Sequence, residues 1–71
     1  MTHTTESILT AAAAALTDVE LHAAVVTARE ALATAEGPLM TDLFATAVEV
    51  MDAEIINRAR VALAAFDAAA A

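Results

Sequence analysis

The stretch "LTDVEL" (residues 16–21) decides how the chain divides into helices. Thr17 and Glu20 have the spacing of a capping box, in which the threonine hydroxyl accepts a hydrogen bond from the Glu20 N–H and the glutamate carboxylate accepts one from the Thr17 N–H. Leu16 and Leu21 occupy the two positions of a hydrophobic staple. A helix is therefore predicted to begin directly after Thr17, and any helix before it must end near Leu16.

The segment before the capping box, residues 5–15, is predicted to form a short helix. It ends in five consecutive alanines, the residues of highest helix propensity, and Ile8 and Leu9 are its only large apolar side chains. An isolated helix of this length is marginal in water, so the segment is expected to be helical only where it docks on another helix.

The segment after the capping box, residues 18–36, is predicted to form a second helix that stops at "EGP" (36–38). Apolar residues recur along it at alternating spacings of four and three, the pattern of a heptad seam: Leu21, Val25, Ala28, Leu32 and Ala35. Gly37 suits the left-handed conformation that often follows a helix, and Pro38 lacks the N–H that would continue the hydrogen-bond ladder.

Residues 39–69 are predicted to form a third, long helix, because nothing in this stretch breaks it. Its start is open between two routes: Pro38 is the first helical residue, or Thr41 caps a helix with Asp42 in its first turn. The sequence therefore predicts an all-α fold in a single domain over residues 1–71. It is a small helical bundle, a long helical hairpin with a short N-terminal helix, in which the first two helices run antiparallel along the third.

The long helix carries two apolar stripes, which is more than one partner helix can cover. The main stripe consists of Met40, Phe44, Val48, Met51, Ile55, Ala59, Ala62 and Phe66, and the second consists of Leu39, Leu43, Val50 and Val61. The two shorter helices have few large side chains, so the second stripe is expected to pack on another chain. The sequence thus predicts a homodimer through the long helix, with an interface of Leu39, Leu43, Val50, Glu54, Arg58 and Val61.

Glu54 and Arg58 lie between these stripes, four residues apart and in the favourable order for an ion pair on a helix. Two interpretations are open. In a symmetric dimer each Arg58 reaches Glu54 of the other copy and sets the register. In a monomer the pair is partly exposed and contributes a few tenths of a kcal/mol.

The size of the chain also favours association. A single domain of 71 residues rarely gains more than roughly 3–5 kcal/mol from its core without a disulfide, a metal or a partner. There is no cysteine, and 22 residues are alanine, whose methyl group contributes little on burial. Oligomerisation is the remaining source of stability.

The charge limits the partners. With three arginines, no lysine and ten acidic residues, the net charge of −7 repels phosphate, so neither direct nucleic-acid binding nor adhesion to an anionic membrane is expected. No run of about 18 apolar residues predicts a membrane span. A cytoplasmic protein is expected, and the lack of lysine with excess alanine is typical of a GC-rich bacterial or phage genome.

No motif predicts a metal site, a cofactor or catalysis. His22 follows Asp18 by four residues and His3 precedes Glu6 by three, but a structural metal site needs four ligands and no cysteine is present. The acidic residues of the stretch 49–54 point in different directions on a helix, as a solvated face does. We therefore expect a protein that is not an enzyme and that holds neither metal nor cofactor.

The function predicted from these features is a small, non-enzymatic interaction module, acting as a homo-oligomer and binding an unidentified protein as an adaptor, an assembly factor or an accessory regulator. The alternative is an acidic decoy or antitoxin-like inhibitor that covers a basic, nucleic-acid-binding site on its partner. A row of carboxylates spaced like phosphates favours the decoy, and a mixed surface favours the adaptor.

Overall fold

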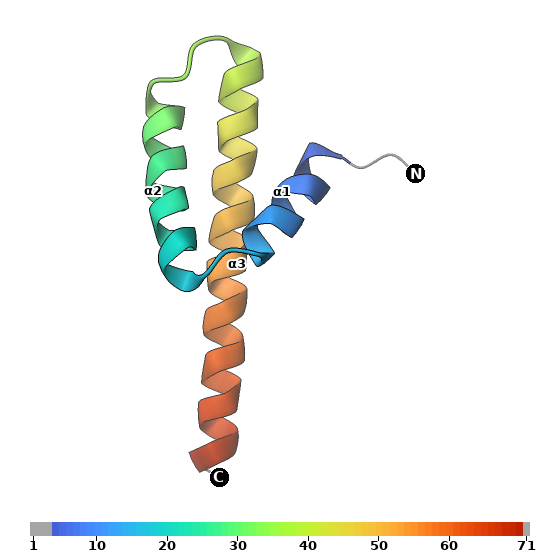
Figure 1. The fold of residues 1–71 in the computed structure, drawn as a ribbon, viewed down its shortest axis with the longest axis vertical. Helices are drawn as coiled ribbons and strands as arrows, with labels where there is room; N and C mark the ends of the chain where they lie inside the picture. The colour runs from blue at the N-terminus through green and yellow to red at the C-terminus, as the bar shows by residue number, and fades with distance from the viewer. Residues whose placement is uncertain (1–3, 71) are drawn as a thin grey trace.

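The computed structural model describes residues 4–70, and within this range it contains three helices and no strand: α1 (Thr5–Ala14), α2 (Asp18–Ala33) and α3 (Pro38–Ala70). α2 and α3 form an antiparallel hairpin, and α1 packs on the middle of α3 from the other side (Figure 1). The prediction of an all-α hairpin with a short N-terminal helix is confirmed. The prediction that α1 also runs antiparallel to α3 is wrong: α1 slants towards the middle of α3 in broadly the same sense, because the short link after it reverses the chain into α2 (Figure 1).

Side-chain caps fix where the first two helices begin. At the start of α1, the Thr4 hydroxyl accepts a hydrogen bond of 3.1 Å from the Ser7 N–H. The capping box of α2 is present in full, with 3.2 Å from the Glu20 N–H to the Thr17 hydroxyl and 2.9 Å from the Thr17 N–H to the Glu20 carboxylate. The two hydrogen bonds satisfy N–H groups that a helix start leaves without partners, which confirms the predicted boundary.

The connection between α2 and α3 differs from the predicted one. α2 ends at Ala33 and not at Glu36, because residues 34–37 are all used to carry the chain across to α3. Gly37 has a φ of +79°, and it serves as the turn before α3 and not as the residue that directly follows α2. Pro38 is the first residue of α3, so the first of the two predicted routes is the one adopted.

A small core lies where the three helices meet. Leu21 of α2 is completely buried and packs with Ala13 of α1 and Val50 of α3. Around these three lie partly buried apolar side chains from all three helices and from the link after α1: Leu9, Leu16, Met51 and Ile55. The predicted seam of α2 faces this core, since Leu21, Val25 and Ala28 are all buried.

The molecule is elongated because α3 is about twice as long as α2 and more than three times as long as α1. α3 has 33 residues and is about 50 Å long at 1.5 Å per residue, and the molecule measures 51 × 32 × 16 Å. The radius of gyration is 14.5 Å, whereas a compact domain of this length has about 11 Å. The C-terminal part of α3 therefore extends past α2 and α1 as a free helix (Figure 1). Every residue from 59 to 70 is exposed, and we call this segment the arm.

Candidate protein-interaction site

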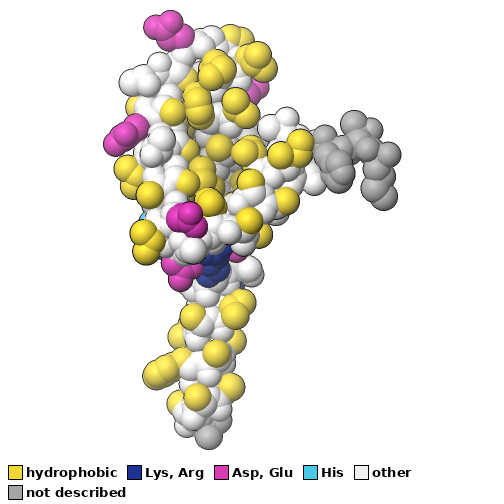
Figure 2. Space-filling model, viewed as in Figure 1, with side chains coloured by type: hydrophobic (Ala, Val, Ile, Leu, Met, Phe, Trp, Pro, Cys, Tyr) yellow, Lys and Arg dark blue, Asp and Glu magenta, His cyan; other side chains and the backbone are white. Residues whose placement is uncertain are grey.

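The arm presents large apolar side chains to solvent. Leu63 is 61% exposed and Phe66 is 69% exposed, and Ile56, one turn before the arm, is half exposed. Hydrophobic side chains are spread along the projecting part of α3 in Figure 2. Alanine-rich sequence keeps the arm helical without a partner helix, because alanine has the highest helix propensity. The arm is thus a preformed helix whose apolar surface is available for binding.

A groove of about 300 Å³ lies at the root of the arm, where α2 begins beside α3. Leu21 and His22 of α2 form one side of the groove, and Ile55, Ala59 and Ala62 of α3 form the other. The main apolar stripe of α3 therefore continues from the hairpin, past this groove and onto the arm. The sequence predicted this stripe. It did not predict that the last part of the stripe extends past the first turn of α2 and has no helix beside it.

A second exposed apolar surface lies at the opposite end of α3, beside the turn from α2. We call it the hairpin-end surface, and it consists of Leu39, Met40 and Leu43. Leu39 is 80% exposed, and a hollow of about 360 Å³ lies between these residues and Thr5 of α1. Large apolar groups in water at both ends of one helix are characteristic of surfaces that bind other proteins.

The six residues predicted as a dimer interface do not form one continuous surface. Leu39 and Leu43 are exposed at one end of α3, and Val61 is exposed on the arm. Between them α1 lies on the same side of α3 and buries Val50 in the core of its own chain. The expectation that the shorter helices cannot cover this stripe is wrong for Val50, because the alanines of α1 allow it to approach α3 closely. Leu39, Leu43 and Val61 stay exposed, as expected.

Glu54 and Arg58 complete this central region, and their partners lie in the same chain. The Arg58 guanidinium donates to the Glu54 carboxylate at 2.9 Å and to the Asp18 carboxylate at 2.7 Å. It also donates to the carbonyl oxygens of Leu16 at 2.7 Å and of Ala13 at 3.3 Å. The second of the two interpretations of the pair, an intrahelical contact, is therefore present, together with contacts to α1 and α2 that the sequence did not predict.

These contacts explain why a guanidinium is stable on this face of α3. The Leu16 carbonyl oxygen, just after α1, accepts its hydrogen bond from Arg58, and a cation at a helix C-terminus interacts favourably with the helix dipole. The hydrogen bonds to Asp18, and then those to Glu54, raise the pKa of Arg58 above its ordinary value. Arg58 thus joins the end of α1, the start of α2 and the middle of α3.

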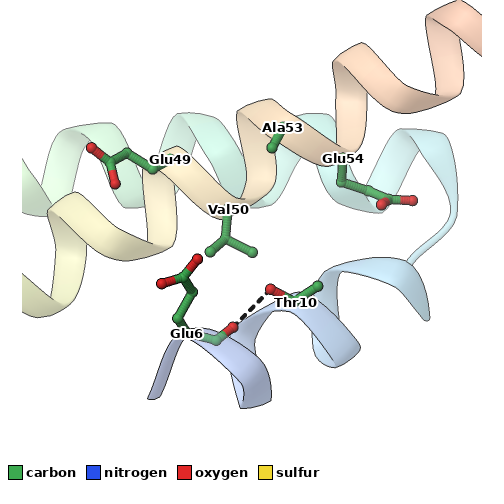
Figure 3. A pocket seen from close by; sticks show the side chains of 6 residues that line it. All are labelled: Glu6, Thr10, Glu49, Val50, Ala53 and Glu54. Atoms are coloured by element: carbon green, nitrogen blue, oxygen red, sulfur yellow. Dashed lines mark hydrogen bonds between the residues drawn. The ribbon is translucent and has the colours of Figure 1, made fainter. Parts of the chain in front are cut away.

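An acidic cleft of about 350 Å³ separates α1 from α3 on the far side of the core (Figure 3). α1 contributes Glu6 and Thr10, and α3 contributes Val50 and Glu54, with Glu49 pointing away from the cleft in Figure 3. The Thr10 hydroxyl donates to the main-chain oxygen of Glu6 at 2.8 Å, and Glu54 is held by Arg58. The Thr10 hydroxyl and the Glu54 carboxylate are thus engaged by partners in the same chain.

The remaining charges form a mixed surface. Arg29 of α2 donates to both carboxylate oxygens of Asp52 in α3 at 2.8 Å, an exposed ion pair that the sequence did not predict. Acidic side chains form separate spots over the face shown in Figure 2. His22 is exposed, and its Nδ1 lies 2.8 Å from the main-chain oxygen of Asp18.

Two further findings concern other classes of site. In the described part of the chain, no three histidine, cysteine, aspartate or glutamate side chains are grouped so as to hold a metal ion, and His3 lies outside that part. None of the helices within residues 4–70 is both long enough and apolar enough to cross a lipid bilayer.

No known protein family, curated protein or solved structure matches this chain. The exposed surfaces of α3 are therefore the basis on which a function is proposed.

Proposed function

We propose that the protein is a small, non-enzymatic interaction module that acts as a homo-oligomer and uses α3 to bind other proteins as an adaptor, assembly factor or accessory regulator. One observation carries the proposal: α3 buries its apolar side chains in the middle and exposes them at both ends, on the arm and on the hairpin-end surface. Exposed apolar groups at separate ends of a rigid helix suit a protein that connects two others.

Affinity capture tests this function. The tagged chain, its Leu39→Glu variant and its Leu63→Glu variant are each incubated with an extract of the source cells, and the bound proteins are identified by mass spectrometry. An identified protein that the wild type retains and one of these variants loses supports the proposal. Val26→Glu is the matched control, because Val26 is 55% exposed and lies in the middle of α2, between the two ends of the hairpin. Equal recovery by all four chains, or no bound protein at all, would overturn the proposal.

The alternative is an acidic decoy that covers a basic site on its partner. The net charge of −7 supports it, because Arg29 and Arg58 are already paired with acidic groups of the same chain and leave most carboxylates uncompensated. The spacing of the acids supports it less. Glu20 and Glu30 on α2 lie about 15 Å apart along the helix, whereas successive phosphates of a DNA strand rise by only about 3.4 Å.

The salt dependence of a captured complex distinguishes the two functions. A decoy complex held by many ion pairs weakens by orders of magnitude between low and physiological salt, as protein–phosphate complexes do. An adaptor complex held by apolar side chains of α3 changes little over the same range. Nucleic-acid-binding activity of the captured protein, blocked by this chain, would establish the decoy.

A further inference from the structure

The exposed apolar side chains on one side of the arm, together with Ile56 one turn before it, follow a heptad pattern. Ile56, Ala59, Leu63, Phe66 and Ala70 succeed one another at spacings of three, four, three and four, and we call this set the arm stripe. Such a stripe is the seam along which one helix packs on another. Val61 is exposed too, but it lies on the opposite side of the helix.

The structure indicates which direction a helix on the arm stripe would take. α2 packs on the first half of α3 in the antiparallel sense and ends its contact at the root of the arm (Figure 1). Ala59 and Phe66 belong to both the main stripe and the arm stripe, whereas Ile56, Leu63 and Ala70 lie to one side of the main stripe. A helix that continues the same packing on the arm runs in the direction of α2 and reaches the groove beside Leu21 and His22.

The charges that flank the arm stripe make it complementary to itself. Arg60 follows Ala59 and Asp67 follows Phe66, so both charges lie on the same edge of the stripe. When two arms pair in opposite directions, Leu63 of one copy packs on Phe66 of the other, and Arg60 of each copy faces Asp67 of the other. Because the pair is two-fold symmetric, each contact occurs twice, which gives two Leu63–Phe66 contacts and two Arg60–Asp67 ion pairs.

A parallel pair of arms has no such match. In that arrangement the edge with Arg60 and Asp67 on one copy faces the edge with Ala62 and Ala69 on the other copy. In the antiparallel pair these alanines face one another and permit a close approach of the two helices. Arg60 forms no ion pair within the part of the chain that the structure describes, so it is free to contact a second copy.

We propose that a second copy of this chain covers the arm stripe, with the two arms antiparallel and joined by Leu63–Phe66 packing and Arg60–Asp67 ion pairs. This inference rests on the proposed function, since it names the partner of one of the two surfaces of α3. The second copy covers the arm beyond the point where the contact of α2 with α3 ends, on a face that shares Ala59 and Phe66 with the main stripe. The hairpin-end surface of each copy remains open for another protein.

A charge-exchange experiment tests this arrangement. In a pair of Arg60→Asp chains, the new aspartate of each copy faces Asp67 of the other. In a pair of Asp67→Arg chains, the new arginine of each copy faces Arg60 of the other. Both variants therefore place like charges opposite one another. Each variant alone is expected to shift from the mass of two chains to that of one in light scattering. An equimolar mixture of the two variants regains two attractive pairs. It is expected to return to two chains, one of each kind by native mass spectrometry.

Matched controls separate association from folding. Leu63→Glu is expected to give a single chain with the helix content of the wild type by circular dichroism. Val61→Glu makes the same change on the opposite side of the arm and is expected to remain a dimer. A wild type of one chain at micromolar concentration would overturn the inference, as would charge variants that both stay dimeric or whose mixture stays monomeric. A wild type that is monomeric, but captures an identified protein that Leu39→Glu does not capture, would overturn the inference and the homo-oligomer and leave only the protein-binding part of the proposed function standing.

Discussion

At the scale of single residues, Arg58 has the widest set of partners in the described chain. Its place on an apolar face of α3 is explained by the carbonyl groups of Ala13 and Leu16 and by Asp18, which lie 40 to 45 positions earlier in the sequence. The spacing of Glu54 and Arg58 predicted their ion pair, because both lie on one helix. No local pattern could predict the other contacts, since they depend on where the link between α1 and α2 meets α3.

Replacing Arg58 by alanine is expected to lower the melting temperature clearly. The substitution removes the donor to the Leu16 carbonyl oxygen and leaves Glu54, which is partly buried, without a cation. Arg29→Ala is the matched control: it removes an ion pair whose side chains are more exposed, 58% for Arg29 and 37% for Asp52, so the loss is at most about 1 kcal/mol. Thermal unfolding followed by circular dichroism compares the two. Equal shifts would show that Arg58 acts only as a surface charge.

The capping box allows a second test at this scale. Thr17→Ala removes the acceptor of the Glu20 N–H and is expected to reduce the free energy of unfolding by about 1 kcal/mol. Thr27→Ala, on the exposed side of the same helix, removes only a hydroxyl that donates to the Ala23 carbonyl oxygen, so it is expected to change stability by less than about 0.5 kcal/mol. Urea unfolding measures both. A Thr17 variant as stable as the Thr27 variant would contradict the cap.

The carboxylate of the capping box makes stability depend on pH. Hydrogen bonds from the main chain of Thr17, and then from its side chain, lower the pKa of Glu20 from its ordinary value of 4.5. A group whose pKa is lower in the folded state stabilises the fold above the unfolded pKa and loses this effect as the pH falls. The wild type is therefore expected to be more stable than Glu20→Gln at pH 7, with the difference shrinking below about pH 4.5. Urea unfolding at a series of pH values measures the difference, and a constant one would contradict the linkage.

At the scale of the elements, the sequence predicted each helix start better than the end of α2. The start of α2 is set by Thr17 and Glu20, which act within one turn, and the start of α3 by Pro38. The end of α2 is not set by a local stop signal. Ala35 and Glu36 fit the helical pattern, yet they lie outside the helix because the hairpin needs residues 34–37 to reach α3. Tertiary geometry thus decides a boundary that the local pattern leaves open.

The packing of α2 on its neighbours depends most on Leu21. It is the one large side chain in the described residues that is completely buried, and it contacts both other helices through the core. Leu21→Ala is expected to destabilise the chain by about 2–5 kcal/mol, which is comparable to the whole stability of a domain of this size. Val19→Ala, on the exposed side of the same helix, is expected to change stability by less than about 0.5 kcal/mol. Circular dichroism at 25 °C checks both, and a fully helical Leu21 variant would contradict this account of the core.

At the scale of the whole molecule, the sequence predicted two stripes on α3 but not which parts of them are covered. Val50 and Val61 belong to the same predicted stripe, yet α1 buries the first and leaves the second in solvent. The coverage depends on the length of α1 and on the angle at which it meets α3, and neither follows from periodicity. The arm arises in the same way, because α2 is only half as long as α3.

The arm also determines how stability should depend on concentration. In a dimer joined by the arm stripe, folding and association are coupled, so the melting temperature rises with protein concentration by mass action. The wild type and Val61→Glu are expected to show this rise. The melting temperature of Leu63→Glu is expected to be the same at every concentration. At low concentration it is expected to be close to that of the wild type, because Leu63 is exposed and does not pack on the rest of its own chain. Scanning calorimetry over a hundredfold range of concentration distinguishes these outcomes. If the melting temperature of the wild type does not change over this range, the arm does not take part in self-association. If the Leu63 variant melts far below the wild type at low concentration, the arm stabilises the single chain.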